Sequence, residues 1–344
     1  MAEKRQPSLQ DIAVQAGVSK ATVSLALRND ARLTAETRAR IQTIARELGY
    51  RPQPLYSTMF SQVRARKPVR QRETLGFLTA FPTRDGWRRA AGLFTEFFEG
   101  ACERANELGF RVDEIWSKEP GMTGRRLTDI LQARGIRGIL IAPLARSRGH
   151  LTLDWSQFAA TTFGPSLWSP PLHRASTDHF SNFVMVLRQL RKRGYRRMGL
   201  VAARAGEERV NYAHVAALYR DQQARPPGDR IAPLLYPRSG LTERDCRQWF
   251  QRARPDVVVS YPGMLAWLRN WHLGVPRDVG FFSLGWHPGA PFAGLNENGH
   301  LIGVAAIDLV VGQLHRNERG IPAHPRVLVV PGGWGDGATL RPAT

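Results

Sequence analysis

Residues 11–27, DIAVQAGVSKATVSLAL, have the apolar spacing of a helix that stops at a glycine and then starts again. Before the glycine, apolar positions recur three and four residues apart, as on one face of a helix. These positions are Leu9, Ile12, Ala13 and Ala16. Gly17 can adopt the left-handed conformation in which helices commonly end, and Ser8 and Ser19 are capping residues. The pattern predicts two short helices joined by a tight turn.

The second of these helices has an inward apolar stripe and an outward face of small and polar residues. The stripe consists of Val23, Ala26 and Leu27, and the outward face of Lys20, Ala21, Thr22, Ser24 and Leu25. In a helix-turn-helix, the second helix presents its N-terminal residues to the major groove of DNA. Hydroxyl groups there suit phosphate oxygens, Lys20 can reach a guanine edge, and Ala21 and Leu25 can contact thymine methyl groups.

A third helix is expected between a cap at Thr34 and Gly49. The three helices could also form a small domain without a ligand. The charge argues against this alternative, because the chain has a formal net charge of +20, and basic residues outnumber acidic ones by 14 to 5 in residues 1–72. A generally basic surface would explain the charge alone, but charge together with a helix-turn-helix favours a DNA partner.

Residues 8–52 resemble the DNA-binding headpiece of the LacI/GalR family of bacterial transcription regulators. The matching segments are LQDIAVQAGVSKATVSLALRND and LTAETRARIQTIARELGYRP. The resemblance implies an all-α headpiece over residues 1–52. Its implied DNA-binding residues are Ser19, Lys20, Ala21, Thr22, Ser24, Leu25, Arg28 and Tyr50. Many relatives carry arginine at the position of Leu25 and asparagine at that of Arg28, so the resemblance implies DNA binding but leaves the operator sequence open.

Residues 53–72 correspond to the hinge helix and basic linker of the family. The resemblance implies that Met59 takes the place of a leucine that enters the minor groove and kinks the DNA, which methionine can also do. Gln53 and Tyr56 differ from the usual residues, so formation of the hinge helix stays open. The basic end of the linker either contacts phosphates or serves as a solvated tether.

From Thr74 onward, short apolar runs such as TLGFLTAF and GILIAPL alternate with amphipathic helical stretches, which predicts parallel βαβ units. The resemblance implies an α/β core of two doubly wound subdomains, similar to the periplasmic sugar-binding proteins, with a ligand cleft between them. Residues 73–344 would form this effector-binding and dimerisation core. The expected lobes are about 73–165 with 295–325, and about 166–294 with 326–344.

Ligands of open α/β sheets bind beyond the carboxyl ends of the strands. The effector-binding candidates in such positions are Phe81, Arg84, Asp85, Trp87, Asp178, Arg209, Tyr261, Trp286 and Glu297. The resemblance places Arg209 at a common ligand contact. Trp87 and Trp286 could stack on a sugar ring, although aromatic residues serve equally well in a core.

Two further features of this region bear on the ligand. The adjacent Glu207 and Glu208 are expected in solvent, because neighbouring helical residues point in different directions. The aspartate that holds sugar hydroxyls in many relatives is absent, since the sequence reads Gly285-Trp286-His287 there. The effector is then an atypical sugar, or is held differently, or does not exist.

The sequence gives no support for catalysis. It lacks the HExxH and Gly-x-Ser-x-Gly motifs, and its two cysteines, Cys102 and Cys246, provide neither a disulfide framework nor metal-ligand spacing. No metal or cofactor is expected. No apolar run reaches the ~18 residues that span a membrane, and the N-terminus has no signal-peptide pattern. A cytoplasmic, nucleoid-associated bacterial protein is expected.

These features together predict a homodimeric transcription regulator, a repressor by resemblance, that binds a pseudo-palindromic DNA operator. Its core would sense a small molecule such as a sugar or a derivative. The alternative is a constitutive or architectural DNA-binding dimer whose core no longer binds a ligand. Repression and activation are not distinguished by the sequence, because they depend on where the operator lies.

Overall fold

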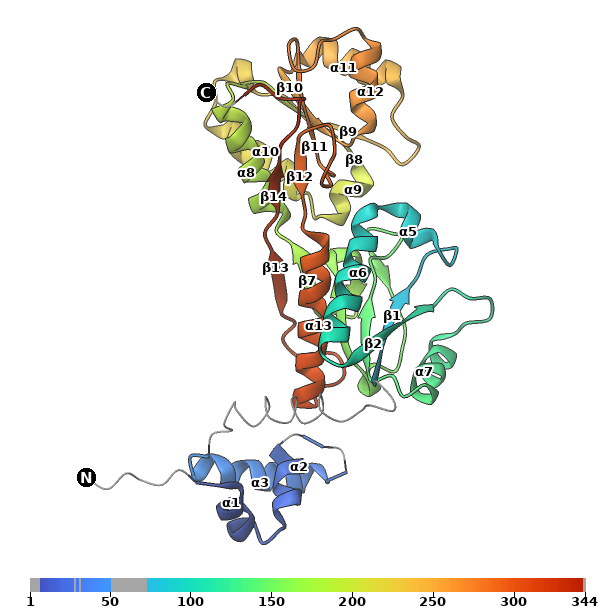
Figure 1. The fold of residues 1–344 in the computed structure, drawn as a ribbon, viewed down its shortest axis with the longest axis vertical. Helices are drawn as coiled ribbons and strands as arrows, with labels where there is room; N and C mark the ends of the chain where they lie inside the picture. Colours follow the sequence, from blue (N-terminus) through green and yellow to red (C-terminus); the bar gives the residue numbers. More distant parts are fainter. Residues whose placement is uncertain (1–6, 28, 31, 51–72, 343–344) are drawn as a thin grey trace, which may run out of the picture.

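The computed structural model describes residues 7–27, 29–30, 32–50 and 73–342 (Figure 1). It contains an N-terminal three-helix domain, hereafter the headpiece, and an α/β core of two lobes stacked along the long axis. This architecture confirms the predicted fold class. The predicted hinge and linker, with Met59, and the DNA contact predicted at Arg28 lie outside the described residues.

The headpiece consists of α1 (Leu9–Ala16), α2 (Lys20–Leu27) and α3 (Ala35–Glu47). Ser8 and Asp11 form a capping box at the start of α1, and Gly17 ends that helix with φ at 65°. Thr34 caps α3 by accepting a hydrogen bond from the amide of Thr37. The small core formed by the three helices contains Ile12, Ala13, Ala16, Val23, Ala26, Ile41 and Ala45.

The first lobe is built on a six-stranded sheet whose neighbouring strands all pair in parallel. In sheet order the strands are β13 (Val327–Val330), β7 (His173–Thr177), β5 (Ala159–Phe163), β3 (Gly138–Ile141), β1 (Glu73–Thr79) and β2 (Phe110–Trp116). The helices are α5 (Gly86–Ala90), α6 (Gly92–Glu107), α7 (Gly124–Ala133) and α13 (Gly299–Arg316), with short 3-10 turns at Trp155–Gln157 and Gly164–Ser166. The short strands β4 (Gly149–His150) and β6 (Leu167–Ser169) pair separately.

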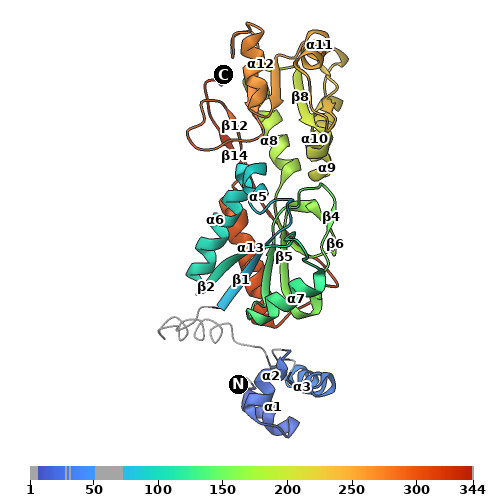
Figure 2. The ribbon, with the colours of Figure 1, turned by 90° about the vertical axis from the view of Figure 1, so that its right-hand side faces the viewer.

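Helices cover both faces of this sheet (Figure 2). Helices α6 and α13 pack together over one face, and α7 contributes to the apolar cluster on the other. Glycines allow α6 and α13 to approach closely, because a Cβ atom at Gly303 would lie 2.3 Å from the carbonyl oxygen of Phe97. The long, apolar α13 thereby joins the end of the chain to the first lobe.

The second lobe has a six-stranded sheet in which only the last pair, β12 and β14, is antiparallel. In sheet order the strands are β14 (Gly333–Gly335), β12 (Gly294–Asn296), β11 (Gly280–Ser283), β10 (Val257–Ser260), β8 (Met198–Ala203) and β9 (Leu234–Tyr236). The helices are α8 (His179–Lys192), α9 (Arg204–Arg209), α10 (Ala213–Gln223), α11 (Glu243–Ala253) and α12 (Gly263–Asn270), with a 3-10 turn at Pro227–Asp229. Among the described residues, no helix is long and apolar enough to cross a bilayer.

The chain crosses between the lobes after β7, after β12 and after β13. The expected lobe boundaries were wrong for three strands, because β6, β7 and β13 fall in the residues expected to form the second lobe. Strands β7 and β13 belong to the first sheet, and β6 pairs with β4 of the first lobe. The reason is their pairing, since β7 lies beside β5 and β13 adds beside β7. Sequence gives no direct signal for such pairing, because each partner is a short apolar strand that fits either sheet.

Asparagine side chains join the three crossing segments. Asn182 is buried, donates to the Thr177 hydroxyl at 2.8 Å and accepts from the Gly332 amide at 2.8 Å. Asn298 donates to the carbonyl oxygen of Pro331 at 2.8 Å. These hydrogen bonds tie the three crossing segments to one another, and this region is hereafter the Asn182 hinge.

Candidate functional site

The exposed face of α2 is the first candidate site. Val23 and Ala26 are fully buried against the other two helices. The predicted DNA contacts on the opposite face are exposed or half-buried: Ser19, Lys20, Ala21, Thr22, Ser24 and Leu25. The Ser19 hydroxyl accepts from the amide of Thr22 at 3.1 Å and so caps the helix. The first turn of α2 is therefore both ordered and accessible, as groove entry requires.

Side chains of α3 fix the position of α2 and α1. Gln42 donates to the carbonyl oxygen of Ala26 at 2.9 Å, and Arg40 donates to that of Ala16 at 3.1 Å. These are orphan carbonyls at helix C-termini, so both hydrogen bonds complete a helix end while joining two helices. Tyr50 lies at the end of this domain and packs partly against its core. Its predicted DNA contact stays a prediction.

The second candidate site is a cleft of about 470 Å³ between the two lobes of the core. Its lining includes residues at or just after the carboxyl ends of strands in both sheets, namely Phe163, Thr177, Tyr261, Leu284 and Glu297. This is where open parallel sheets bind ligands. A cavity of this size is in the range that holds small organic molecules.

Of the nine predicted effector residues, the structure brings four together in this cleft. They are Phe81, Arg209, Tyr261 and Glu297. Phe81 lies in the loop after β1, and Arg209 lies in α9. Tyr261 and Glu297 directly follow β10 and β12. Their roles in binding stay predictions, but their convergence from both lobes is what a ligand-binding cleft requires.

The two tryptophans do not line the cleft. Trp87 is fully buried in the first lobe, and its indole nitrogen donates to Glu114 at 2.8 Å. Trp286 donates to the carbonyl oxygen of Phe292 at 3.0 Å and packs over Gly335, where a Cβ atom would lie 2.3 Å from its ring. Both indoles have an internal hydrogen-bond partner and a packed surface, so they serve the fold rather than the cleft.

The remaining three predicted residues also lie away from the cleft lining. Asp178 caps α8 by accepting from the amide of Ser181 at 3.0 Å. Arg84 and Asp85 are exposed in the loop before α5, and the Asp85 carboxylate forms an ion pair with Arg89 at 3.3 Å. These three residues were predicted because each follows a strand. Asp178 instead caps its own helix, and Arg84 and Asp85 point to solvent from the loop after β1.

Sequence reasoning missed the aromatic floor of the cleft. Phe97 and Phe163 stack with ring centroids 5.0 Å apart and planes 7° apart, and Phe94 stacks on Phe97 at 6.0 Å. Phe81 meets Phe94 edge to face at 6.4 Å. In the sequence, Phe94 and Phe97 form part of an ordinary apolar helix stripe, and that stripe has the same appearance whether it faces a core or a cavity.

The expectation that Glu207 and Glu208 lie in solvent is wrong. Glu207 is buried and its carboxylate lies 2.7 Å from Nδ1 of His214, another cleft residue. Glu208 accepts from the Ser147 hydroxyl of the first lobe at 3.1 Å, and Arg209 donates to the first-lobe carbonyl oxygen of Ala145 at 3.3 Å. The short helix α9 therefore bridges the two lobes across the cleft.

Two ionisable side chains of the second lobe, those of His179 and Glu297, lie in a poorly solvated wall of the cleft. Burial lowers the pKa of His179 to about 3, so the ring is neutral, and burial raises the pKa of Glu297 to about 7. The two groups lie 3.5 Å apart, with Nδ1 of His179 facing a carboxylate oxygen of Glu297. The charge of this wall near neutral pH therefore depends on the protonation of Glu297.

Replacing Glu297 with glutamine is expected to flatten the pH dependence of stability between pH 5 and 8. Its ordinary pKa of 4.5 is raised to about 7 in the folded chain. In that window the folded state holds the proton more tightly, so stability falls as pH rises. Between pH 5 and 8 the wild type should lose roughly 1–3 kcal/mol of unfolding free energy that the variant keeps. Urea unfolding at pH 5 and at pH 8 measures this loss, with the exposed Glu119→Gln variant as the control. Equal pH profiles of the wild type and the Glu297→Gln variant would contradict the prediction.

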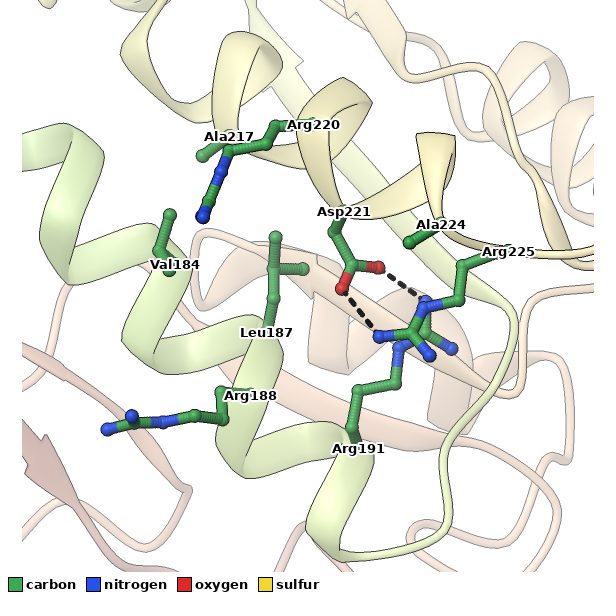
Figure 3. Close-up of a pocket in the computed structure, with 9 residues that line it drawn as sticks. All are labelled: Val184, Leu187, Arg188, Arg191, Ala217, Arg220, Asp221, Ala224 and Arg225. Carbon is green, nitrogen blue, oxygen red and sulfur yellow. Dashed lines mark hydrogen bonds and ion pairs between the residues drawn. The ribbon is translucent and has the colours of Figure 1, made fainter.

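A separate groove lies on the flank of the second lobe, between α8 and α10 (Figure 3). Val184, Leu187 and Ala217 form its apolar part. Arg191 and Arg225 converge on the carboxylate of Asp221, at 2.6 Å and 3.2 Å. This groove is away from the carboxyl ends of the strands, and its arginines join two helices through one shared aspartate.

The Asp221→Asn substitution is expected to destabilise the second lobe by about 1–2 kcal/mol. The side chains of Asp221 and Arg191 are each 16% exposed, and removing the carboxylate charge leaves the poorly solvated Arg191 guanidinium without its counterion. Urea unfolding measures the loss. Asp129→Asn makes the same charge change at an exposed position of α7 and should be nearly neutral. Equal stability of the two variants would show that the shared aspartate is unimportant.

The headpiece has a clear relationship to known proteins. Residues 8–53 match the family model described as bacterial regulatory proteins, lacI family. The N-terminal domain is thus similar to the DNA-binding domain of that family. The chain is also 24% identical to the HTH-type transcriptional repressor CytR of Escherichia coli K12 over 286 residues, which cover 79% of this chain and 78% of that protein. The resemblance seen in the sequence is thus confirmed.

Solved structures support the same fold for the whole chain. A transcriptional regulator CelR–cellobiose complex has a TM-score of 0.54 at 19% identity and covers 97% of this chain and 99% of that one. The lac repressor dimer bound to operator and the anti-inducer ONPF has a TM-score of 0.56 at 16% identity, with 98% and 100% coverage. The two-lobed core of the chain therefore has the same fold as these two proteins.

Proposed function

We propose that this chain is a sequence-specific, DNA-binding transcription repressor whose core senses a small molecule. The observation that carries the proposal is the exposed, capped face of α2 on a tightly packed helix-turn-helix. Lys20 and Ala21 are exposed in its first turn, and Leu25 follows one turn later. Similarity to a protein named as a repressor and to a repressor bound to operator supports the same function.

The proposed DNA target is a pseudo-palindrome bound by a homodimer. A two-fold dimer presents two recognition helices, which match two half-sites about one or more helical turns apart. Dimerisation through the core, action in the cytoplasm at the nucleoid, and a lack of enzymatic activity are parts of the same proposal. The contacts proposed at Arg28 and Met59 belong to it as well.

The proposed effector site is the cleft between the lobes. Arg209 is well placed there because it already crosses from the second lobe to the carbonyl oxygen of Ala145. A molecule bound between the lobes changes how they close about the Asn182 hinge, and lobe closure would set the distance between the two headpieces. The coupling free energy of such allosteric pairs is typically about 1–3 kcal/mol.

The proposed function is tested by retaining fragments of the source genome on the purified protein and sequencing them. A near-palindrome recovered upstream of a few genes is the expected result. Retention that is independent of sequence and disappears as salt is added would mean that only phosphates are bound. That outcome would overturn sequence-specific regulation and favour the architectural alternative. Retention of no fragment at low salt would overturn DNA binding itself.

A further inference from the structure

The second lobe carries an excess of positive charge that DNA binding by the headpiece does not use. Most of it lies in residues 188–197, 220–230 and 252–256, which contain eleven basic residues and three acidic ones. Each of these segments leads from the end of a helix to the start of β8, β9 or β10. These strands pair in parallel, so their amino ends share one edge of the sheet, opposite the carboxyl ends that face the cleft.

The basic side chains at this edge form what is hereafter the distal basic surface. Its members are exposed or half-buried: Arg188, Arg191, Arg196, Arg197, Arg220 and Arg254. In Figure 1 the second lobe and the headpiece lie at opposite ends of the molecule, with the first lobe between them. The distal basic surface therefore cannot contact the same stretch of DNA as the recognition helix α2.

Hydrogen bonds join the three segments into one continuous surface. Arg191 of α8 donates to the carboxylate of Asp221 at 2.6 Å and to the carbonyl oxygen of Arg196 at 2.5 Å. Arg197 donates in turn to the carbonyl oxygen of Arg254 at 2.9 Å. The groove between α8 and α10 (Figure 3) is therefore continuous with the amino ends of the strands.

The fold leaves much of this positive charge without a counterion. The carboxylate of Asp256 accepts from the backbone amides of Arg196 and Arg197, at 2.6 Å and 2.9 Å, and so is taken up by the backbone. Carbonyl partners orient a guanidinium group without cancelling its charge. Arg188 of α8 and Arg220 of α10 are exposed, and neither has a hydrogen bond or an ion pair within the described part of the chain.

The partner that fits this arrangement of charges is the phosphate backbone of a DNA duplex. The arginines are spread over the ends of three helices instead of converging in one deep cavity. The groove among them has a volume of about 270 Å³, which is small for an organic ligand. A duplex presents one phosphate charge about every 1.7 Å along its axis, and its neutralisation by spread cations releases counterions. Arginine also matches phosphate oxygens in geometry.

We propose that the distal basic surface binds a second DNA segment without regard to sequence, so that a protein bound to its operator also bridges to distant DNA. Weak binding suffices, because a second segment of the same DNA molecule is present at a high effective concentration. The proposal goes beyond the proposed function, which assigns DNA binding to the headpiece. It rests on that function only for the contact with the operator.

The test adds a fluorescent duplex of unrelated sequence to full-length protein that is bound to a surface-held operator duplex. The wild type is expected to capture the second duplex. The Arg188→Gln/Arg220→Gln variant should capture it on the order of 50-fold more weakly at about 0.1 M salt, with about two fewer counterions released. This variant is expected to fold, because both side chains are exposed and unpaired in the described structure.

A matched control separates this surface from the overall charge of the protein. Lys118→Gln/Arg125→Gln removes two exposed charges from the first lobe and should capture the second duplex as the wild type does. Equal capture by the wild type and the Arg188→Gln/Arg220→Gln variant, or no capture by the wild type at low salt, would overturn the proposal. Saturable binding of inorganic pyrophosphate without capture of the duplex would overturn it as well, because the surface would then bind a small anion.

Operator binding is measured on the same samples by fluorescence anisotropy, so that the two proposals can fail separately. The Arg188→Gln/Arg220→Gln variant is expected to bind the operator as tightly as the wild type. A wild type that does not bind the operator overturns the proposed function. Binding of the unrelated duplex in solution then tests the distal basic surface alone, and equal salt dependences of the wild type and the variant would overturn its role.

Discussion

The Lys20→Ala variant is expected to bind the selected operator about 5- to 150-fold more weakly than the wild type, which corresponds to about 1–3 kcal/mol. Lys20 is exposed in the first turn of α2, at the point where a recognition helix meets base edges. A lysine that bonds to the N7 and O6 atoms of guanine loses two acceptors when it is shortened to alanine. Binding to operators substituted at each base pair measures the effect.

The pattern of the loss separates two roles for Lys20. Contact with a base predicts relaxed preference at one position and little change elsewhere. Contact with phosphate alone predicts the same loss of affinity on every sequence. The salt dependence of binding would then correspond to about one fewer released counterion. The second pattern would remove Lys20 from the base-reading residues. Lys118→Ala, which removes the same charge from an exposed position in the core, should leave operator binding unchanged.

The Gly303→Ala variant is expected to lower the free energy of unfolding by about 3 kcal/mol. A Cβ atom at this position would lie 2.3 Å from the carbonyl oxygen of Phe97 and 2.7 Å from the amide nitrogen of Ala101. Both neighbours are backbone atoms of α6, so relief requires moving a whole helix. Alanine would gain up to about 1 kcal/mol in helix propensity, which is too small to offset the clash.

A matched control lies on the same helix. At Gly312 the nearest atom to a new Cβ atom is the tip of the Arg316 side chain, at 3.1 Å, and this flexible side chain can move aside. Gly312→Ala is therefore expected to be neutral or to stabilise by up to about 1 kcal/mol. Urea unfolding compares the two. Equal stabilities would mean that α6 and α13 can separate at no cost and that their close contact does not hold the first lobe.

The headpiece was predictable because its structure depends on residues close together in the chain. Ser8, Gly17 and Thr34 act on helix ends within a few residues of themselves, and the apolar spacing alone selects the buried faces. The recognition face of α2 then follows as the side that is not buried. The cleft was predictable only in part, because Phe81, Arg209, Tyr261 and Glu297 could be placed after strands without knowing which strands pair.

The sequence by itself determined the three helices of the headpiece, the alternation of strands and helices in the core, and the class of protein. Tertiary structure alone decided that β7 and β13 join the first sheet, that Trp87 and Trp286 serve the fold, and that Glu207 is buried against His214. The physical reason is the range of the interactions. Helix caps and apolar periodicity act over a few residues, whereas strand order and the facing walls of a cleft depend on which distant segments pack together.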